Sequence, residues 1–233
     1  MAGHGPINTI PLYCSDEHIL IRAAGDFPQL CPSWQTMASG IDGYFNAGYP
    51  WILNSPSNVF DQQGCVAQMV VQLTGPQTAF RGSGQFFAID SALGSALTLR
   101  RIDQPLNAGM PPAPAAGLTG VSFIVNTLNP QIENATRDIK SRYGIDEMVF
   151  YRASLWMYQG VEDLYRDCRD VTVLETLYQR YQHEARVDKG DFAKKAKTFK
   201  QEFEESMNQV QIRWGPFGNS QPPATKFGTR FAR

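Results

Sequence analysis

Cysteine and histidine, the side chains that most often act as nucleophiles or metal ligands, are few in this chain and stand apart from one another. The cysteines are Cys14, Cys31, Cys65 and Cys168, and the histidines are His4, His18 and His183. No CxxC pair occurs and no two histidines lie within four positions of each other. This spacing favours separate buried thiols over a disulfide framework or a zinc site. A Cys–His nucleophile needs only proximity in space, so a pairing of Cys31 or Cys168 with His18 or His183 stays open as an alternative.

The motifs that bind nucleotides or place a nucleophile are missing from the sequence. The nearest approach to a phosphate loop, residues 81–84, leads into a predicted strand rather than into a helix whose N-terminus would hold the anion. Adjacent acidic pairs such as Asp146 and Glu147 stand near predicted helix starts, where capping and solvation explain them. We therefore predict no catalytic residue, no cofactor and no metal, and expect that the protein is not an enzyme.

Composition and charge limit the class of protein. The chain has 233 residues, is 42% hydrophobic and 18% charged, and carries a formal net charge of -1. This balance excludes wholesale disorder and the broad positive surface of a dedicated DNA-binding protein, and no apolar run is long enough for a membrane span. The N-terminus lacks a secretory signal, so we expect synthesis in a cytoplasm. Residues 1–127 contain four basic and seven acidic side chains against 17 and 15 in residues 128–233, which indicates two differently built parts.

The first half predicts one helix, an irregular region and a small sheet. Residues 15–24 have helical spacing behind a capping residue, and residues 26–65 are rich in Pro, Gly and aromatic residues, with a short helix expected over residues 33–38. Strands are predicted over residues 68–74, 85–90, 96–102 and 121–125, the middle two forming a hairpin. Four aromatic residues of this half could form a sugar-stacking platform, although packing in the core explains them more readily. They are Trp34, Tyr44, Tyr49 and Trp51.

The second half predicts helices. Capping residues and apolar periodicity predict helices over 128–143, from Asp146 through Tyr158 or beyond, from Asp170, and from Asp188 or Asp191 to Val210. Short links between four such helices favour an antiparallel bundle. The aromatic seams of the late helices are expected to be shared with neighbouring copies. The last residues, 215–233, interleave aromatic and basic side chains and contain no acidic group, which suits a segment ordered by a partner.

The predicted fold class is α+β, with a C-terminal antiparallel helical bundle as the body, a small antiparallel β domain at its periphery and extended terminal arms. The predicted divisions are an irregular and helical region over 1–64, the β domain over 65–127, the bundle over 128–214 and the tail over 215–233.

Residues 128–214 resemble the helical core of the head-to-tail connector, or adaptor, proteins of tailed bacteriophages. The resemblance lies in the capped helix 128–143, the helix 170–186 with its Leu-Tyr-Gln-Arg-Tyr run at 177–181, the charged Gly-containing turn 188–191 and the aromatic, Lys- and Glu-rich helix 192–210. A β domain before this core departs from the smaller, mostly helical connectors.

The resemblance implies a virion protein of the neck region that is made in the host cytoplasm and forms a homo-oligomeric ring, usually twelve-membered. It also implies binding to the portal protein and to tail or neck proteins, and DNA passing through the lumen without sequence-specific binding or catalysis. The tail is the candidate segment for partner binding. Its candidate residues are Phe217, Lys226, Phe227, Arg230, Phe231 and Arg233. The alternative function is a carbohydrate- or ligand-binding module carried by the N-terminal aromatic and β regions.

Overall fold

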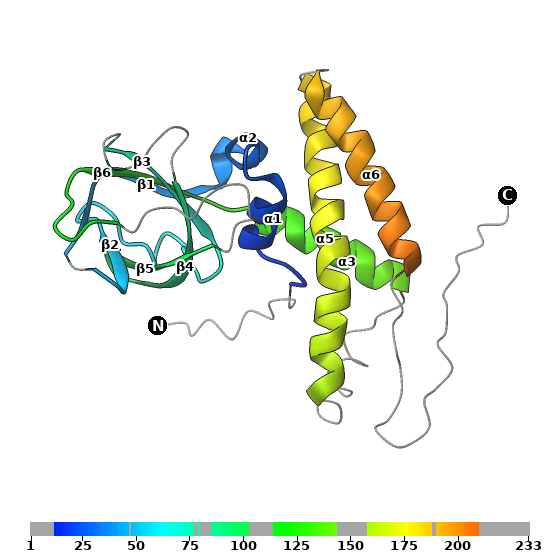
Figure 1. Cartoon of the computed structure of the whole chain (residues 1–233), viewed down its shortest axis with the longest axis horizontal. Coiled ribbons are helices and arrows are strands. Elements are labelled where there is room, and N and C mark those ends of the chain that lie inside the picture. Colours follow the sequence, from blue (N-terminus) through cyan, green and yellow to red (C-terminus); the bar gives the residue numbers. More distant parts are fainter. Residues whose placement is uncertain are drawn as a thin grey trace, which may run out of the picture. The chain divides into compact units, whose positions relative to one another are not determined.

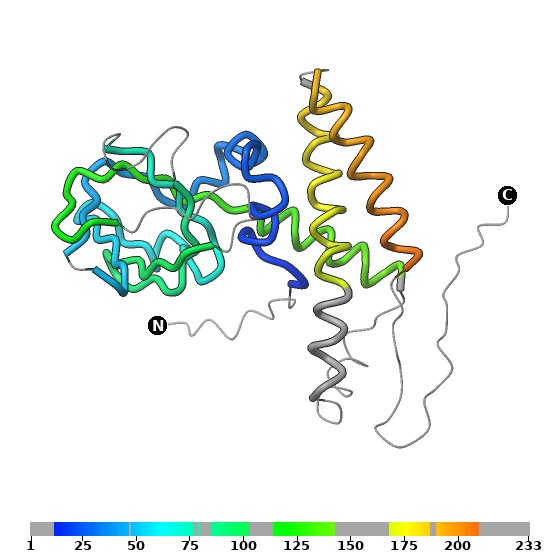
Figure 2. The backbone as a smooth tube through the Cα atoms, in the orientation of Figure 1, coloured from blue at the N-terminus to red at the C-terminus, as the bar shows by residue number. Residues whose placement is uncertain are grey.

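The computed structural model describes residues 12–46, 48–76, 79, 85–102, 114–143, 158–187 and 190–209, with the backbone alone at 158–167 and 187. The chain divides into two compact units (Figures 1 and 2). The barrel unit is Ser15–Asn129, and the helical unit combines the residues before Ser15 with those from Pro130 onward.

The barrel unit is built around six antiparallel strands that close on themselves. The strands are β1 (Thr36–Phe45), β2 (Trp51–Asn54), β3 (Val70–Gly75), β4 (Gln85–Leu93), β5 (Ala96–Arg101) and β6 (Val121–Asn126). Their order around the barrel is β1-β2-β5-β4-β3-β6, and β6 pairs with both β3 and β1. Closure leaves no free sheet edge among these strands.

Alternation along the strands fills the barrel with apolar side chains. Leu97 and Leu99 on β5 point inward with Phe87 and Ile89 on β4, and they share one core with Leu53, Val71, Phe123 and Val125. The β4–β5 hairpin turns at Gly94, whose φ of +56° suits a residue without a side chain. β1 carries irregularities around Gly40 and Gly43, where it crosses closely over β6.

Two short helices and one 3-10 turn precede the barrel. They are α1 (Asp16–Ala23), α2 (Phe27–Leu30) and η1 (Ser33–Gln35). α1 buries Ile19 and Leu20 completely, and the Phe27 ring forms a T-shaped pair with Phe86 of β4 at a centroid distance of 6.1 Å. Apolar burial therefore holds these helices within the barrel unit.

The helical unit contains α3 (Asn129–Tyr143), α5 (Tyr158–Val187) and α6 (Asp191–Gln209). α6 runs back alongside α5 (Figure 1), and Phe203 shares a buried cluster with Val171 and Leu174. The Tyr181 ring of α5 stacks on Phe199 of α6 at 5.2 Å. Among the described residues, no helix is both long enough and apolar enough to cross a membrane.

The predicted fold class is wrong. The β part is a closed six-stranded barrel rather than a small peripheral sheet, because residues 36–45 and 51–54 of the region predicted to be irregular form two of its strands. The helix expected over residues 33–38 is only a 3-10 turn before β1. The strands predicted within 68–125 and the helix over 15–24 are present, with small shifts at their ends.

The second half departs from the predicted bundle as well. The helices expected over 128–143 and from Asp191 are confirmed by α3 and α6. Asp170 does not begin a helix, because it lies inside the 30-residue α5. The helix predicted from Asp146 falls mostly on residues 144–157, which lie outside the described residues, as does the tail at 215–233.

Candidate functional site

The residues predicted to bind the portal belong to the C-terminal segment 215–233, which lies outside the part of the chain that the structure describes. They are Phe217, Lys226, Phe227, Arg230, Phe231 and Arg233. Their role stays a prediction from the sequence.

The aromatic residues suggested as a sugar-stacking platform are not gathered into one platform. Trp51 points into the barrel core and is 8% exposed, whereas Tyr49, just before it, is 79% exposed. The two rings contact each other edge to face at 5.5 Å. Trp34 lies in η1 and Tyr44 is half-buried on β1. Of the four residues, Tyr49 and Trp51 are in contact with each other. The Trp51 ring is part of the barrel core.

The Trp51 ring contacts two other aromatic rings, those of Tyr49 and Phe87, and the guanidinium of Arg101; we call this group the Trp51 column. The Trp51 ring meets Phe87 of β4 edge to face at 5.9 Å, and the guanidinium carbon of Arg101 lies 5.0 Å from its centroid. Arg101 lies opposite Phe87 in the β4–β5 register, so one cross-strand position brings the cation to the indole. The column anchors Tyr49 at its exposed end.

Large apolar side chains are exposed on three strands of the barrel, β1, β2 and β4. Ile41 of β1 is 79% exposed and Leu93 at the end of β4 is 78% exposed, while Ile52 of β2 is also exposed. With Tyr49 they make up what we call the barrel face. β5 lies between β2 and β4 and adds Thr98, which pairs with Ile52, and Ala96, which pairs with Leu93. The barrel face therefore presents apolar and uncharged groups to solvent.

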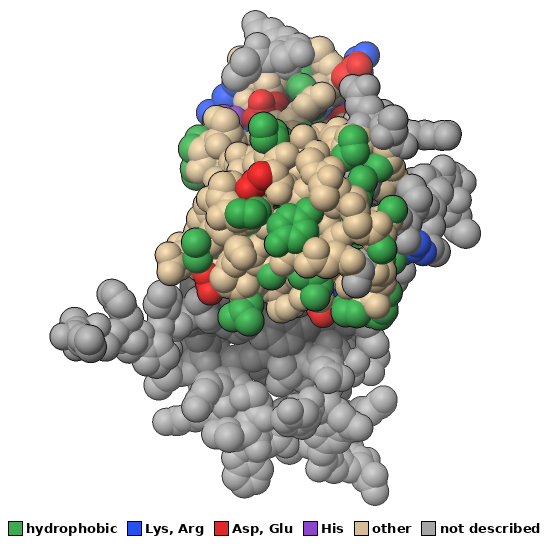
Figure 3. Space-filling model, turned by 90° about the vertical axis from the view of Figure 1, so that its left-hand side faces the viewer, with side chains coloured by type: hydrophobic (Ala, Val, Ile, Leu, Met, Phe, Trp, Pro, Cys, Tyr) green, Lys and Arg blue, Asp and Glu red, His purple; other side chains and the backbone are tan. Residues whose placement is uncertain are grey.

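The side of the barrel that Figure 3 shows has hydrophobic side chains scattered among uncharged ones. A few acidic groups interrupt it there. Single exposed apolar side chains are ordinary on a protein surface, and it is a contiguous apolar patch that marks a surface covered by another protein.

Asp42 fixes the loop beside the barrel face. Its carboxylate accepts hydrogen bonds from the Ser55 hydroxyl at 2.8 Å and from the Ser57 backbone N–H at 3.0 Å. Hydrogen bonds from the Ser55 and Ser57 side chains hold the pKa of Asp42 below its ordinary value. The Asn58 amide donates to the Ser39 carbonyl and to the Ser55 hydroxyl, so β1 and the chain after β2 are tied together at several points.

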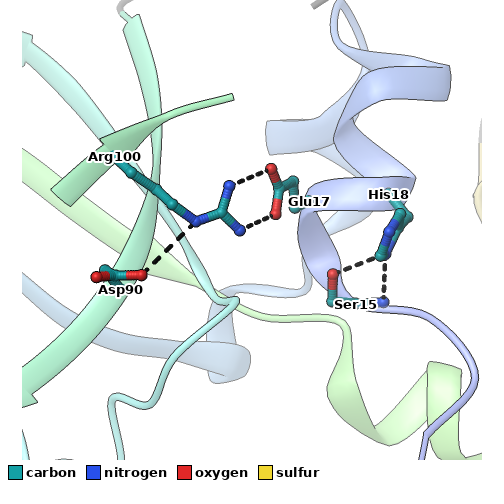
Figure 4. A network of polar contacts seen from close by, with 5 residues as sticks. All are labelled: Ser15, Glu17, His18, Asp90 and Arg100. Carbon is teal, nitrogen blue, oxygen red and sulfur yellow. Dashed lines mark hydrogen bonds and ion pairs between the residues drawn. The ribbon is translucent and has the colours of Figure 1, made fainter. Parts of the chain in front are cut away.

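A second polar network joins α1 to the barrel (Figure 4). The Arg100 guanidinium of β5 donates two hydrogen bonds to the Glu17 carboxylate, and its Nε lies 3.8 Å from Asp90 of β4. At the start of α1, the backbone N–H of Ser15 donates to Nδ1 of His18 at 3.1 Å, and the Ser15 hydroxyl lies 2.8 Å from the same nitrogen. His18 therefore closes the first turn of α1.

Asp16, between these residues, is completely buried. Its Oδ1 accepts the Leu128 backbone N–H at 2.6 Å, and the Thr127 side chain also hydrogen-bonds to the carboxylate. Oδ2 has no hydrogen-bond partner among the described residues. Burial raises the pKa of Asp16 to about 7, although both hydrogen bonds act to lower it.

Of the Cys–His pairings left open by the sequence, the structure excludes that of Cys168 with His183. Cys168 and His183 lie on the same helix, where fifteen residues separate them by about 22 Å. Nδ1 of His18 accepts a hydrogen bond from the Ser15 backbone N–H at the N-terminus of α1. Burial raises the pKa of the Cys65 thiol to about 11, which keeps it in the unreactive thiol form. Within the described ranges, no group of three or more His, Cys, Asp and Glu side chains could hold a metal ion.

No family model, no curated protein and no solved structure matches the chain.

Sequence reasoning missed both the barrel face and the Asp16 and Glu17 contacts. The Ile52 position could have been found from the alternation of Trp51, Ile52 and Leu53, which places the middle residue outside. The partners of Asp16 and Glu17 lie so far along the chain that a single sequence carries no signal for them.

Proposed function

We propose that the protein is a structural assembly protein, a head-to-tail connector of a tailed bacteriophage that forms a ring between portal and tail. The observation that carries the proposal is the barrel face, where Ile41, Tyr49 and Leu93 leave most of their apolar surface in water. Covering such side chains by a second copy removes apolar area from water, which favours association by roughly 25 cal/mol per Å² before its costs. Repetition of one head-to-tail contact around an axis closes a ring.

The helical unit supports the proposal in a different way. α3 and α6 are helices in the region, residues 128–214, on which the resemblance to connector cores rests. The aromatic side chains of α6, however, pack on α5 of the same chain, since Phe203 is buried and the Phe199 ring stacks on Tyr181. We therefore assign the contacts between copies to the barrel face rather than to these helices.

Portal binding by the tail and passage of DNA through the ring belong to the same proposal. Residues 128–233 carry nearly balanced charge and residues 1–127 carry an acidic excess, so the composition supplies no large positive excess for holding DNA. The segment 215–233 offers aromatic and basic side chains for a partner whose binding offsets the cost of ordering it.

The test is the oligomeric state of the full chain. We expect native mass spectrometry and negative-stain images to show rings, alone or after a portal protein is added. Ile41→Asp combined with Leu93→Asp puts two charges on the barrel face and should leave monomers with an unchanged circular dichroism spectrum.

Val66→Asp is the matched control, because Val66 is also exposed but lies outside the barrel face, and it should keep the ring. A wild-type chain that stays monomeric with and without portal protein would refute the connector. Rings that persist in the double variant would refute the role of the barrel face.

A further inference from the structure

The segment that follows β2, residues 55–61, lies between β1 and the turn of the β4–β5 hairpin. On one side, the Asp42 carboxylate of β1 accepts the Ser57 backbone N–H at 3.0 Å. On the other side, the Gly94 N–H of the hairpin turn donates to the Asp61 carboxylate at 3.1 Å. The Gly94 carbonyl also accepts a backbone N–H of the segment at 2.7 Å. Hydrogen bonds to both neighbours therefore fix the position of the segment.

Three exposed apolar side chains gather around this segment. Val59 lies within it and is 41% exposed. Ile41 precedes Asp42 on β1 and Leu93 precedes Gly94 in the hairpin, so each is next to a residue that binds the segment. The three side chains therefore belong to one patch of surface, which we call the barrel rim. It consists of Ile41, Val59 and Leu93 with the carboxylates of Asp42 and Asp61.

The charge of the barrel rim is negative. Hydrogen bonds hold the pKa of Asp42 below its ordinary value, so this carboxylate is fully charged at neutral pH. Among the described residues between 36 and 99, the charged side chains are Asp42, Asp61 and Asp90, and none of them is basic. Arg81, the one basic residue in that range, lies outside the described residues. Two barrel rims would repel each other, which disfavours a contact between the same faces of two copies.

The C-terminal segment 215–233 has the complementary composition. It contains three phenylalanines and three basic residues and no acidic residue. Lys226 is followed directly by Phe227, and Arg230 directly by Phe231. Basic side chains complement the charge of the barrel rim, and phenylalanine rings can cover its apolar side chains.

We propose that the barrel rim of one copy binds the C-terminal segment 215–233 of a neighbouring copy. The contact joins two different surfaces of the chain, so it is a head-to-tail contact of the kind that closes rings. The inference rests on the proposed function for the ring, and it names the segment that a neighbouring copy brings to the barrel. A portal protein that binds the same segment competes with this contact, so the tests are made without portal protein.

Fluorescence anisotropy of a labelled synthetic peptide with the sequence of residues 215–233 measures the contact. The receptor is the full chain with Phe227→Ser and Phe231→Ser, which weakens competition from its own C-terminal segment. We expect saturable binding that becomes weaker as salt is added, because salt screens the attraction between opposite charges. Adding Ile41→Ser and Leu93→Ser to the receptor should weaken binding roughly tenfold or more, since two apolar side chains are lost from the contact.

Trp34→Ser is the matched control, because Trp34 is 73% exposed in η1 and is not part of the barrel rim. It should bind the peptide as tightly as the parent receptor. Asp61→Asn removes one charge and keeps an oxygen that can accept the Gly94 N–H, and it should weaken binding roughly twofold to fivefold. Absence of saturable binding, or equal binding by the receptor with Ile41→Ser and Leu93→Ser, overturns the proposal.

Cysteine cross-linking shows which copy supplies the segment. All four native cysteines are buried, so new thiols can be placed at exposed Ser95, close to Leu93, in one preparation and at Ala232 in another. After the Ser95→Cys and Ala232→Cys chains are mixed and oxidised, we expect a disulfide-linked dimer that contains one chain of each kind. A disulfide that forms only within single chains carrying both substitutions overturns the proposal.

The connector and the rim contact can fail separately. Peptide binding and the mixed dimer without any ring, with or without portal protein, would refute the connector and leave the rim contact standing. Rings that persist in the full chain with Phe227→Ser and Phe231→Ser would refute the rim contact and leave the connector standing.

Discussion

The Arg100 guanidinium on β5 donates two hydrogen bonds to the Glu17 carboxylate on α1, although the two residues lie 83 positions apart in the sequence. The Glu17 side chain is 12% exposed and the Arg100 side chain 40%. A bidentate pair with one partner mostly buried is stronger than a surface ion pair, because little water competes for the carboxylate.

Removal of this pair should destabilise the barrel unit. We expect Glu17→Gln, Arg100→Gln and the double variant to give a coupling energy of about 1–2 kcal/mol in a double-mutant cycle of urea unfolding. The matched control is the exposed pair Glu133–Arg137 on α3, for which about 0.3–0.5 kcal/mol is expected. Equal coupling energies for the two pairs would contradict this interpretation.

The buried carboxyl groups predict that the protein becomes less stable as pH rises from about 4 to about 7. Burial raises the pKa of Asp16 to about 7, and burial likewise raises that of Glu175 on α5 to about 7, against the opposing charge of Arg142. Between the ordinary and the raised pKa, the folded chain keeps a proton that the unfolded chain has lost. The free energy of unfolding should therefore fall by up to roughly 1.4 kcal/mol per pH unit for each group and level off above both raised values.

Urea unfolding at a series of pH values measures this slope. The variant that combines Asp16→Asn with Glu175→Gln cannot take up either proton and should show a much flatter profile. Asp42→Asn is the control, because the pKa of Asp42 is lowered and its contribution is lost only at more acidic pH. Parallel profiles for the wild type and the double variant would rule out these two groups as the source.

The sequence was informative where the structure follows from neighbouring residues. The hairpin of β4 and β5 and the helices α3 and α6 could be predicted, because their periodicity and their turn or capping residues lie within a short window. β1 could not be predicted from the sequence, because its glycines and small residues interrupt the alternation that identifies a strand. Barrel closure depends on the pairing of β1 with β6, which joins segments about 80 residues apart and leaves no local pattern.

The candidate site shows the same limit. Tyr49 and Trp51 are indistinguishable by composition, yet one ring is exposed and the other is in the core, because only the second lies on an inward position of a strand. The exposure of Ile41 and Leu93 depends on which face of a barrel each residue occupies. Because the sequence predicted a small sheet and no barrel, it did not indicate which residues point outward from the barrel.

Gly43 lies where β1 passes close to β6 and gives a sharp test of the barrel. A Cβ added there would lie 2.8 Å from the Val121 carbonyl oxygen and 2.9 Å from the Leu53 side chain. Backbone cannot move aside cheaply in a closed ladder, so Gly43→Ala should lower the free energy of unfolding by about 1–3 kcal/mol. Gly25→Ala is the matched control, because nothing lies within 4 Å of its added Cβ and its φ is not in the left-handed region. It should be close to neutral in the same chemical unfolding measurement, and an equal loss in both variants would show that β1 does not cross β6 this closely.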